Sequence, residues 1–250
     1  MDRVRHHYIR SGDVRLRAQR REVAAPSGPP VVLIHGMAAD HRTWRRTARA
    51  LRAAGRPTIT YDQRGHGGSD HSPEYLLDEL AADAERVVDE LGLDRFDVVG
   101  HSLGGQTALR LAWRRPDAVR RLALEEMPPL PQHADQVPES MDAPITARRL
   151  RLAVKQVVQS PGALVNFDKT MMDSVLPQFD PDPTWWERVA STPQPALVIS
   201  GGPLDFLKPE HLRLVADALP HGEFRELGGG HTVHREAPAR FHRAVLDFLA

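Results

Sequence analysis

Cysteine is absent from the 250 residues of this chain. Its absence excludes disulfide bonds, thiolate metal ligands and a cysteine nucleophile. Lysine is scarce as well, since Lys155, Lys169 and Lys208 are the only ones. The 33 basic residues balance 33 acidic ones, and the formal net charge of +0 gives no reason to expect nucleic acid or an anionic membrane as a partner.

Long apolar runs are also missing. No window approaches the roughly 20 apolar residues that a membrane-spanning helix needs. Residues 1–23 carry charges every few positions and lack the apolar core of a signal peptide. We therefore expect a cytoplasmic protein. With 41% hydrophobic residues, the chain can bury the core of one α/β domain, and its oligomeric state stays open.

The order of apolar patterns predicts an α/β fold. Alternating residues on both sides of Ser11-Gly12-Asp13 predict an opening β-hairpin, and short runs such as "VVLIH" are typical of strands buried on both faces. Strands that alternate with helices pair in parallel, with helices on both faces of the sheet. We expect strands at 31–35, 57–62, 96–100, 119–126, 196–200 and 223–227, and helices at 41–54, 76–91, 103–116, 208–219 and 237–250.

The alternation stops after residue 126 and resumes at residue 196. The segment between is rich in proline, poor in strand patterns and too long for a simple loop. We interpret residues 127–195 as a helical cap inserted between two parts of the core, 1–126 and 196–250. Its candidate helices lie at 144–159, 161–174 and 183–190.

A serine lies in the sequence Gly-His-Ser-Leu-Gly, between a predicted strand and a predicted helix. A sharp strand-to-helix turn of this kind holds a serine at the carboxyl edge of the sheet, where small neighbours permit the strained approach. The alternative is a glycine turn with an incidental serine. The context favours Ser102 as a nucleophile.

A serine nucleophile needs a base, usually a histidine. His231 follows the last predicted strand and a glycine run, at the same sheet edge as Ser102. We prefer it to His234, which we expect at the start of the final helix. His101 should point away from the serine, with a packing or hydrogen-bonding role.

The base in turn needs a carboxylate that fixes its tautomer and stabilises its charged form. Asp205 follows the strand at 196–200, and Glu126 ends the strand at 119–126. Either could reach the histidine. We favour Asp205, keep Glu126 as the alternative, and expect Glu125 to lie within its strand.

Negative charge that develops on a substrate oxygen needs two preorganised donors. The N–H of Leu103, directly after the serine, is one candidate. The N–H of Met37, in the loop after the strand at 31–35, is the other, with Gly36 allowing close approach.

These motifs together resemble the α/β-hydrolase fold family. The segments "VVLIHGM", "YDQRGHGGSD", "VVGHSLGG", "LVISGGPLD" and "GGGHTVHREAP" occur in the order of that family. The resemblance implies an eight-stranded, mostly parallel sheet with a helical cap. It implies a structural role for Asp62, Arg64 and His66, and for His35 a place behind the site.

The resemblance also assigns the chemical roles. It makes Ser102 the nucleophile, Asp205 the acid, His231 the base, and the amides of Met37 and Leu103 the oxyanion hole. A serine in this position disfavours dehalogenase and epoxide hydrolase chemistry, which needs an aspartate. It favours hydrolysis of an ester, thioester or lactone through an acyl-serine, with no cofactor and no metal.

Large apolar residues of the cap and the adjoining loops predict a pocket for a small to medium apolar acyl group. Two alternatives remain: non-hydrolytic chemistry on a biosynthetic intermediate (cyclisation, elimination, C–C cleavage or cofactor-free perhydrolysis), and a non-catalytic binder, which would not need all three site residues. The pocket candidates are Trp44, Met127, Phe167, Met171, Trp185, Trp186 and Phe206.

Overall fold

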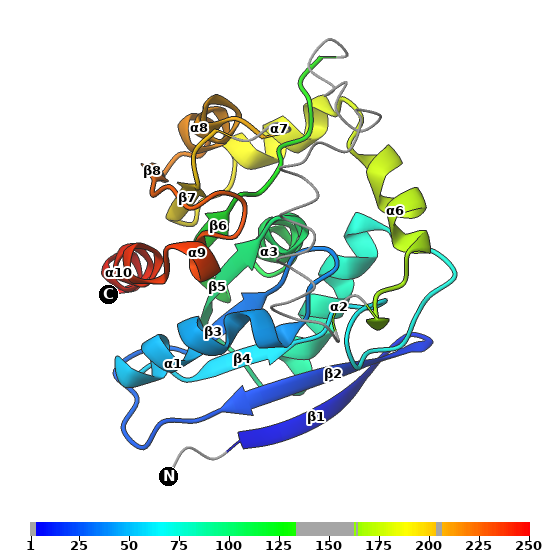
Figure 1. Ribbon diagram of the computed structural model, residues 1–250, viewed down its shortest axis with the longest axis vertical. Coiled ribbons are helices and arrows are strands. Elements are labelled where there is room, and N and C mark those ends of the chain that lie inside the picture. The colour runs from blue at the N-terminus through cyan, green and yellow to red at the C-terminus, as the bar shows by residue number, and fades with distance from the viewer. Residues whose placement is uncertain (1–3, 134–162, 164, 204–206) are drawn as a thin grey trace.

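An eight-stranded sheet forms the centre of the molecule, with helices packed on both faces (Figure 1). The computed structural model describes residues 4–133, 163, 165–203 and 207–250. The sheet order is β1-β2-β4-β3-β5-β6-β7-β8. Its strands are β1 (Val4–Ser11), β2 (Val14–Arg21), β3 (Val31–Ile34), β4 (Thr58–Tyr61), β5 (Phe96–His101), β6 (Val119–Glu125), β7 (Ala196–Ser200) and β8 (Gly222–Glu226).

Most of the sheet is parallel. The pairs of β1 with β2 and of β2 with β4 are antiparallel, and every other pair is parallel. Gly12, with φ of 58°, makes the tight turn of the opening hairpin. The predicted fold, a mostly parallel eight-stranded α/β sheet, is confirmed.

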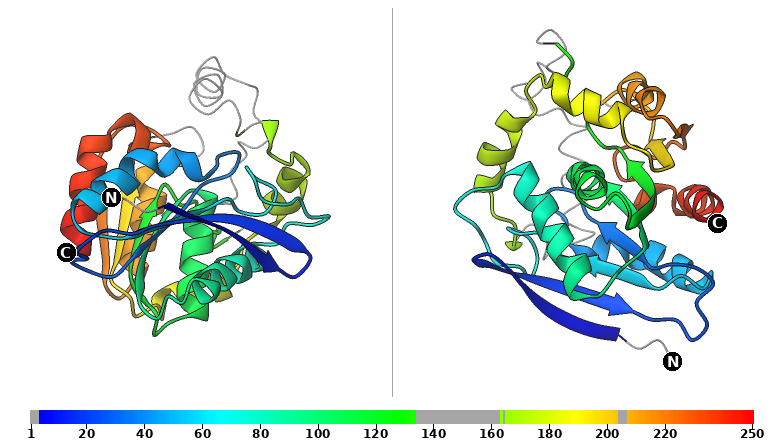
Figure 2. Two further views of the ribbon diagram at one scale, coloured as in Figure 1. Left: turned by 90° about the horizontal axis from the view of Figure 1, so that it is seen from below. Right: turned by 180° about the vertical axis from the view of Figure 1, so that it is seen from behind.

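Helices cover both faces of the sheet, and the turned views show the two helical layers on either side of it (Figure 2). The longer helices are α1 (Arg45–Ala53), α2 (Leu77–Glu90), α3 (Leu103–Arg114), α8 (Pro209–Ala218) and α10 (Pro238–Leu249); the 3-10 helix η1 (His41–Trp44) precedes α1, and the short α9 (Val233–Glu236) precedes α10. Apolar residues of α1 and α10 pack on one face, and those of α2, α3 and α8 pack on the other.

The central parallel strands β3, β5, β6 and β7 contribute apolar side chains to both layers. In β3, Val31 and Leu33 pack toward α1 and α10, whereas Val32 and Ile34 pack toward α2 and α3. All four are fully buried. Because successive side chains of a strand point to opposite faces, a continuous apolar run is what a strand covered on both sides requires.

The chain between β6 and β7 contains helices and no strand in its described residues, 126–133, 163 and 165–195. It contains α6 (Thr170–Val175), the 3-10 helix η4 (Leu176–Gln178) and α7 (Pro183–Ala190). The helix expected at 183–190 is present, and the one expected at 144–159 lies outside the described residues. None of the helices in the described ranges combines the length and apolar character needed to cross a lipid bilayer.

The expected helix at 161–174 is interrupted at Phe167 and Asp168. Asp168 is instead tied to the loop after β4: its N–H donates to the carbonyl of Gly65 at 2.9 Å, and its carboxylate accepts from the hydroxyl of Tyr75 at 2.6 Å. These long-range hydrogen bonds fasten this segment to the chain that follows β4 and override the local helical pattern.

Candidate active site

Ser102 lies at the junction of β5 and α3 in a strained conformation, with φ of 51° and ψ of −119°. A non-glycine residue rarely adopts a positive φ, and here the turn requires it. A Cβ on Gly104 would lie 2.3 Å from the carbonyl oxygen of Ile34, and one on Gly100 would lie 2.3 Å from that of Gly104. The two glycines flanking the serine are therefore required by packing.

His231 faces the serine. Its Nε2 lies 3.0 Å from Oγ of Ser102, within hydrogen-bond distance. The backbone carbonyl of His231 lies 2.6 Å from Nε2 of His101, which must be the donor because the oxygen can only accept. Burial lowers the pKa of His101 to about 3, so its ring is neutral at physiological pH. His101 thus points away from Ser102 and holds the loop that carries His231.

Glu126 is the carboxylate that the structure places on the other side of His231. Its Oε2 lies 3.3 Å from Nδ1 of His231, and its Oε1 accepts a hydrogen bond of 2.6 Å from the N–H of Gly201. The side chain is fully buried. Glu126 has a φ of 50°, which breaks the strand alternation after β6. Asp205, the acid favoured from the sequence, lies outside the described residues.

Glu125, the preceding residue, forms a second carboxylate–histidine pair. Its carboxylate lies 2.7 Å from Nδ1 of His234 and accepts from the N–H of His234 at 2.8 Å. Both side chains are fully buried. Burial raises the pKa of Glu125 to about 7 and lowers that of His234. His234 lies in α9, just before the final helix. Its pairing with Glu125 was not predicted from the sequence. The available signal was two adjacent glutamates together with two histidines at His-x-x-His spacing.

The two amides expected to form the oxyanion hole follow β3 and β5, which are neighbouring parallel strands. Leu103 is the first residue of α3, where N–H groups have no intrahelical acceptor. Met37 lies in a turn closed by a hydrogen bond of 3.2 Å from Ala39 N–H to Gly36 O. A Cβ on Gly36 would lie 2.6 Å from Nδ1 of His101, so only glycine fits there.

Buried histidines support this turn from behind. His66 accepts a hydrogen bond of 3.1 Å from the N–H of Ala38, and its Nδ1 lies 2.9 Å from the carbonyl of Arg64. Burial lowers the pKa of His66 to about 3, which keeps it neutral and able to accept. His35 likewise accepts from the N–H of Gln63 at 3.0 Å.

Arg64 and Asp62 maintain the loop after β4. Arg64 makes a two-pronged ion pair with Asp83 and a further one with Glu79. Asp62 accepts from the N–H and the ring of His41; burial opposes its ionisation, but these bonds lower its pKa to about 2. Their contacts are structural, as the sequence indicated.

Two of the expected pocket residues lie beside the loop that carries Met37. Phe167 and Met171 share an apolar cluster with Leu103, and Met37 packs against it. The ring of Phe167 lies 5.0 Å from that of His66. Met127 is buried against Gly105: a Cβ added to Gly105 would lie 2.7 Å from the Cβ of Met127. Phe206 lies outside the described residues.

Three tryptophans among the pocket candidates lie in the core or against it. Trp44 is fully buried in the layer formed by α1 and α10. Its ring lies 4.3 Å from that of His234. Trp185 is buried in the core between α3 and α8 and donates to Gln106 at 3.2 Å. Trp186 packs edge-on against Trp185 and donates to the carbonyl of Leu130. All three therefore pack within the hydrophobic core or against it.

One group in the described part of the chain has the composition of a metal site. Ligand atoms of Asp40, His41 and Asp62 lie within 4.8 Å of one another. Asp40 is, however, paired with Arg42, and Asp62 accepts from His41. With these atoms engaged by cationic and N–H groups, the cluster is better suited to holding the loops together than to holding a cation.

The comparisons with known proteins agree with this architecture. A family model described as the alpha/beta hydrolase fold matches residues 29–142. The sn-1-specific diacylglycerol lipase ABHD11 of Mus musculus is 27% identical over 249 residues, covering 89% of this chain and 81% of the relative. Esterase YbfF of Escherichia coli is 25% identical over 236 residues, covering 88% of this chain and 92% of the relative.

Solved structures share the fold across nearly the whole chain. Est816, described as an N-acyl homoserine lactone degrading enzyme, superimposes with a TM-score of 0.76 at 24% identity, covering 97% of this chain and 100% of the other. A thermophilic esterase from Thermogutta terrifontis gives a TM-score of 0.75 at 20% identity, covering 99% and 98%. The chain therefore has the α/β-hydrolase fold.

Proposed function

We propose that this protein hydrolyses carboxylic esters, thioesters or lactones of small to medium apolar acyl compounds through an acyl-serine. One observation carries the proposal: Ser102 Oγ, the two ring nitrogens of His231 and the Glu126 carboxylate form a continuous chain of contacts of 3.0 and 3.3 Å. Nucleophile, base and orienting acid in this geometry constitute a catalytic triad whatever their order in the sequence. The curated relatives reported above bear the names of lipases and esterases.

In the acylation step, Nε2 of His231 takes the proton of Ser102 as Oγ attacks the carbonyl carbon. The electron pair of the C=O bond moves to oxygen, where the N–H groups of Leu103 and Met37 stabilise the charge. The intermediate collapses, the bond to the leaving alcohol or thiol breaks, and His231 returns the proton to it. A water molecule, deprotonated by His231, then releases the acyl group by the same steps in reverse order.

Glu126 acts through His231. With Nδ1–H directed at the carboxylate, Nε2 is left unprotonated and able to accept the serine proton. Gly201 N–H holds the second carboxylate oxygen, so the side chain has a fixed direction. We accordingly assign Glu126 as the acid, in place of the Asp205 that the sequence favoured.

The acyl group is assigned to the side of the site where Met37 meets the cluster of Phe167 and Met171. These side chains are apolar and bear no charge that would recognise a polar acyl chain. The preference expected is therefore for uncharged acyl groups of a few to several carbons.

The test is covalent labelling with a fluorophosphonate followed by intact-mass measurement, on the natural chain and on Ser102→Ala. We expect one adduct on the natural chain and none on the variant. Turnover is then measured on p-nitrophenyl esters of increasing chain length and on a thioester and a lactone of matched acyl group.

Each outcome decides between mechanisms. An unlabelled natural chain would exclude an acyl-serine. Labelling at Ser102 without turnover of any ester, thioester or lactone would instead favour non-hydrolytic chemistry at the same site, with His231 as a general base.

A further inference from the structure

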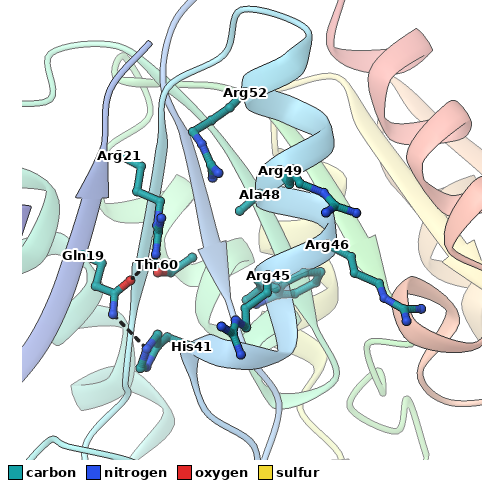
Figure 3. A pocket seen from close by; sticks show the side chains of 10 residues that line it. Gln19, Arg21, His41, Arg45, Arg46, Ala48, Arg49, Arg52 and Thr60 are labelled. Atoms are coloured by element: carbon teal, nitrogen blue, oxygen red, sulfur yellow. Dashed lines mark hydrogen bonds between the residues drawn. The ribbon is translucent and has the colours of Figure 1, made fainter. Parts of the chain in front are cut away.

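A hollow lies between α1 and the strands β2 and β4, and it is lined with arginine (Figure 3). Its volume is about 510 Å³. The lining residues, which we call the arginine pocket, are Gln19, Arg21, His41, Trp44, Arg45, Arg46, Ala48, Arg49, Arg52 and Thr60.

The charge of the pocket departs from that of the chain as a whole. The full sequence balances 33 basic residues with 33 acidic ones, yet no acidic residue lines the pocket and none occurs between Asp40 and Asp62. Within the part of the chain that the structure describes, Arg45, Arg46 and Arg49 form no ion pair, whereas nearby Arg42 and Arg56 pair with Asp40 and Asp97. Positive charge is therefore concentrated here without an internal counterion on these three side chains.

The arginines come from two elements. Arg45, Arg49 and Arg52 recur at helical spacing along α1, and Arg21 extends from β2 (Figure 3). Helix positions four or three apart lie on one face, so these α1 side chains form one edge of the hollow. Arg21 lies on the other edge.

Neutral polar groups form the floor. Gln19 Nε2 lies 3.0 Å from Nε2 of His41, and the Gln19 carbonyl oxygen accepts from Arg21 (Figure 3). Nδ1 of His41 lies 2.7 Å from Asp62, which makes it the donor and leaves Nε2 to accept from Gln19. The amide is thus fixed by the network, and Thr60 beside it is nearly buried.

We propose that the arginine pocket binds a small soluble ligand bearing phosphate groups, such as a compound with a diphosphate. Guanidinium groups present planar pairs of N–H donors that match phosphate oxygens, and an anion relieves the repulsion among like charges in a hollow. The volume is that of a small-molecule site. A nucleic acid would be expected to require a more extended basic surface.

The experiment is isothermal titration calorimetry with inorganic pyrophosphate at constant ionic strength, on the natural chain and on Arg45→Gln/Arg49→Gln. Glutamine keeps the helix and removes two charges. We expect one site on the natural chain and an affinity at least about tenfold lower in the variant, since charge-assisted hydrogen bonds are lost. The matched control is Arg95→Gln/Arg213→Gln, which removes two exposed charges from other elements and should bind pyrophosphate as the natural chain does.

Circular dichroism of both double variants verifies that they are folded. Absence of binding to the natural chain, or equal weakening in the control variant, would overturn the proposal. Tighter binding of a single-stranded oligonucleotide, or co-sedimentation with phosphatidylglycerol vesicles in the absence of pyrophosphate binding, would also overturn it and assign the arginines to a nucleic acid or a lipid surface.

Discussion

Glu125 and Glu126 are consecutive in the chain, yet their carboxylates contact two different histidines. Oε2 of Glu126 lies 3.3 Å from Nδ1 of His231, and the carboxylate of Glu125 lies 2.7 Å from Nδ1 of His234. The positive φ of Glu126 separates the two directions. One pair faces Ser102, and the other fastens α9, which directly follows the His231 loop, to the end of β6.

The first prediction concerns the acid. Glu126→Gln should lower kcat by about 10³–10⁴-fold, because an amide can favour the wrong tautomer of His231. Asp205→Asn is the matched comparison and should lower kcat far less. Steady-state kinetics on one ester measure both losses. A larger loss of kcat from Asp205→Asn would show that Asp205, and not Glu126, is the acid that orients His231.

The second prediction concerns Glu125. Its pKa is raised by burial to about 7, so the folded protein holds a proton there that the unfolded chain releases above about 4.5. This proton stabilises the fold at low pH, and the stabilisation is lost as the pH rises through about 7.

Glu125→Gln keeps an acceptor for His234 and cannot ionise. The free energy of unfolding of the natural chain, relative to that of the variant, should therefore fall between about pH 4.5 and 7. Urea unfolding at several pH values measures it. A constant difference would show that Glu125 does not titrate in that range.

The sequence predicted the sheet and most helices because buried strands leave continuous apolar runs and helices leave apolar residues at helical spacing. It also predicted the contact of Ser102 with His231, since the carboxyl ends of parallel strands meet at one edge. It also separated Glu126, at the end of the strand, from Glu125, within the strand, but it favoured Asp205 over Glu126 as the partner of His231. Strand alternation ends at Glu125, and the reversal at Glu126 depends on Gly201 and Ile199 of the neighbouring strand and loop.

The placement of the tryptophans likewise depends on tertiary structure. An aromatic residue at a helix start is equally consistent with a pocket or a core until the layer of that helix is known. Trp44 is buried because α1 lies beside α10, and Trp185 is buried because α7 packs on α3 and α8. These are properties of the tertiary arrangement that local sequence does not encode.

The third prediction concerns the neutral histidines. Burial lowers the pKa of His66 to about 3, below that of an unfolded histidine near 6.5. Between these values the unfolded chain binds a proton that the folded state excludes, so the stability contributed by neutral His66 is present above about pH 6.5 and lost as the pH falls. His66→Gln retains an acceptor for Ala38 and should flatten the decline of unfolding free energy from pH 6.5 to 5. The exposed His6, changed to Gln, is the control and should leave the slope as it is.

The fourth prediction compares two adjacent glycines of α3. A Cβ on Gly104 would lie 2.3 Å from the carbonyl oxygen of Ile34, which is backbone of β3, whereas a Cβ on Gly105 would lie 2.7 Å from the Cβ of Met127 and 3.5 Å from its Cα. Alanine favours a helix by about 1 kcal/mol over glycine at either position. Overpacking typically costs about 1–3 kcal/mol. The cost is expected near the upper end of this range where backbone must move.

Gly104→Ala should therefore lower the free energy of unfolding clearly more than Gly105→Ala, and it should also lower kcat because Ile34 leads into the Met37 loop. Gly105→Ala should lower both quantities less, since the nearest atoms are Cβ and Cγ of Met127 and the nearest backbone atom is 3.5 Å away. Chemical unfolding and ester kinetics on the two variants measure the contrast. Equal effects on both quantities would show that the approach of α3 to β3 does not set the geometry of the oxyanion site.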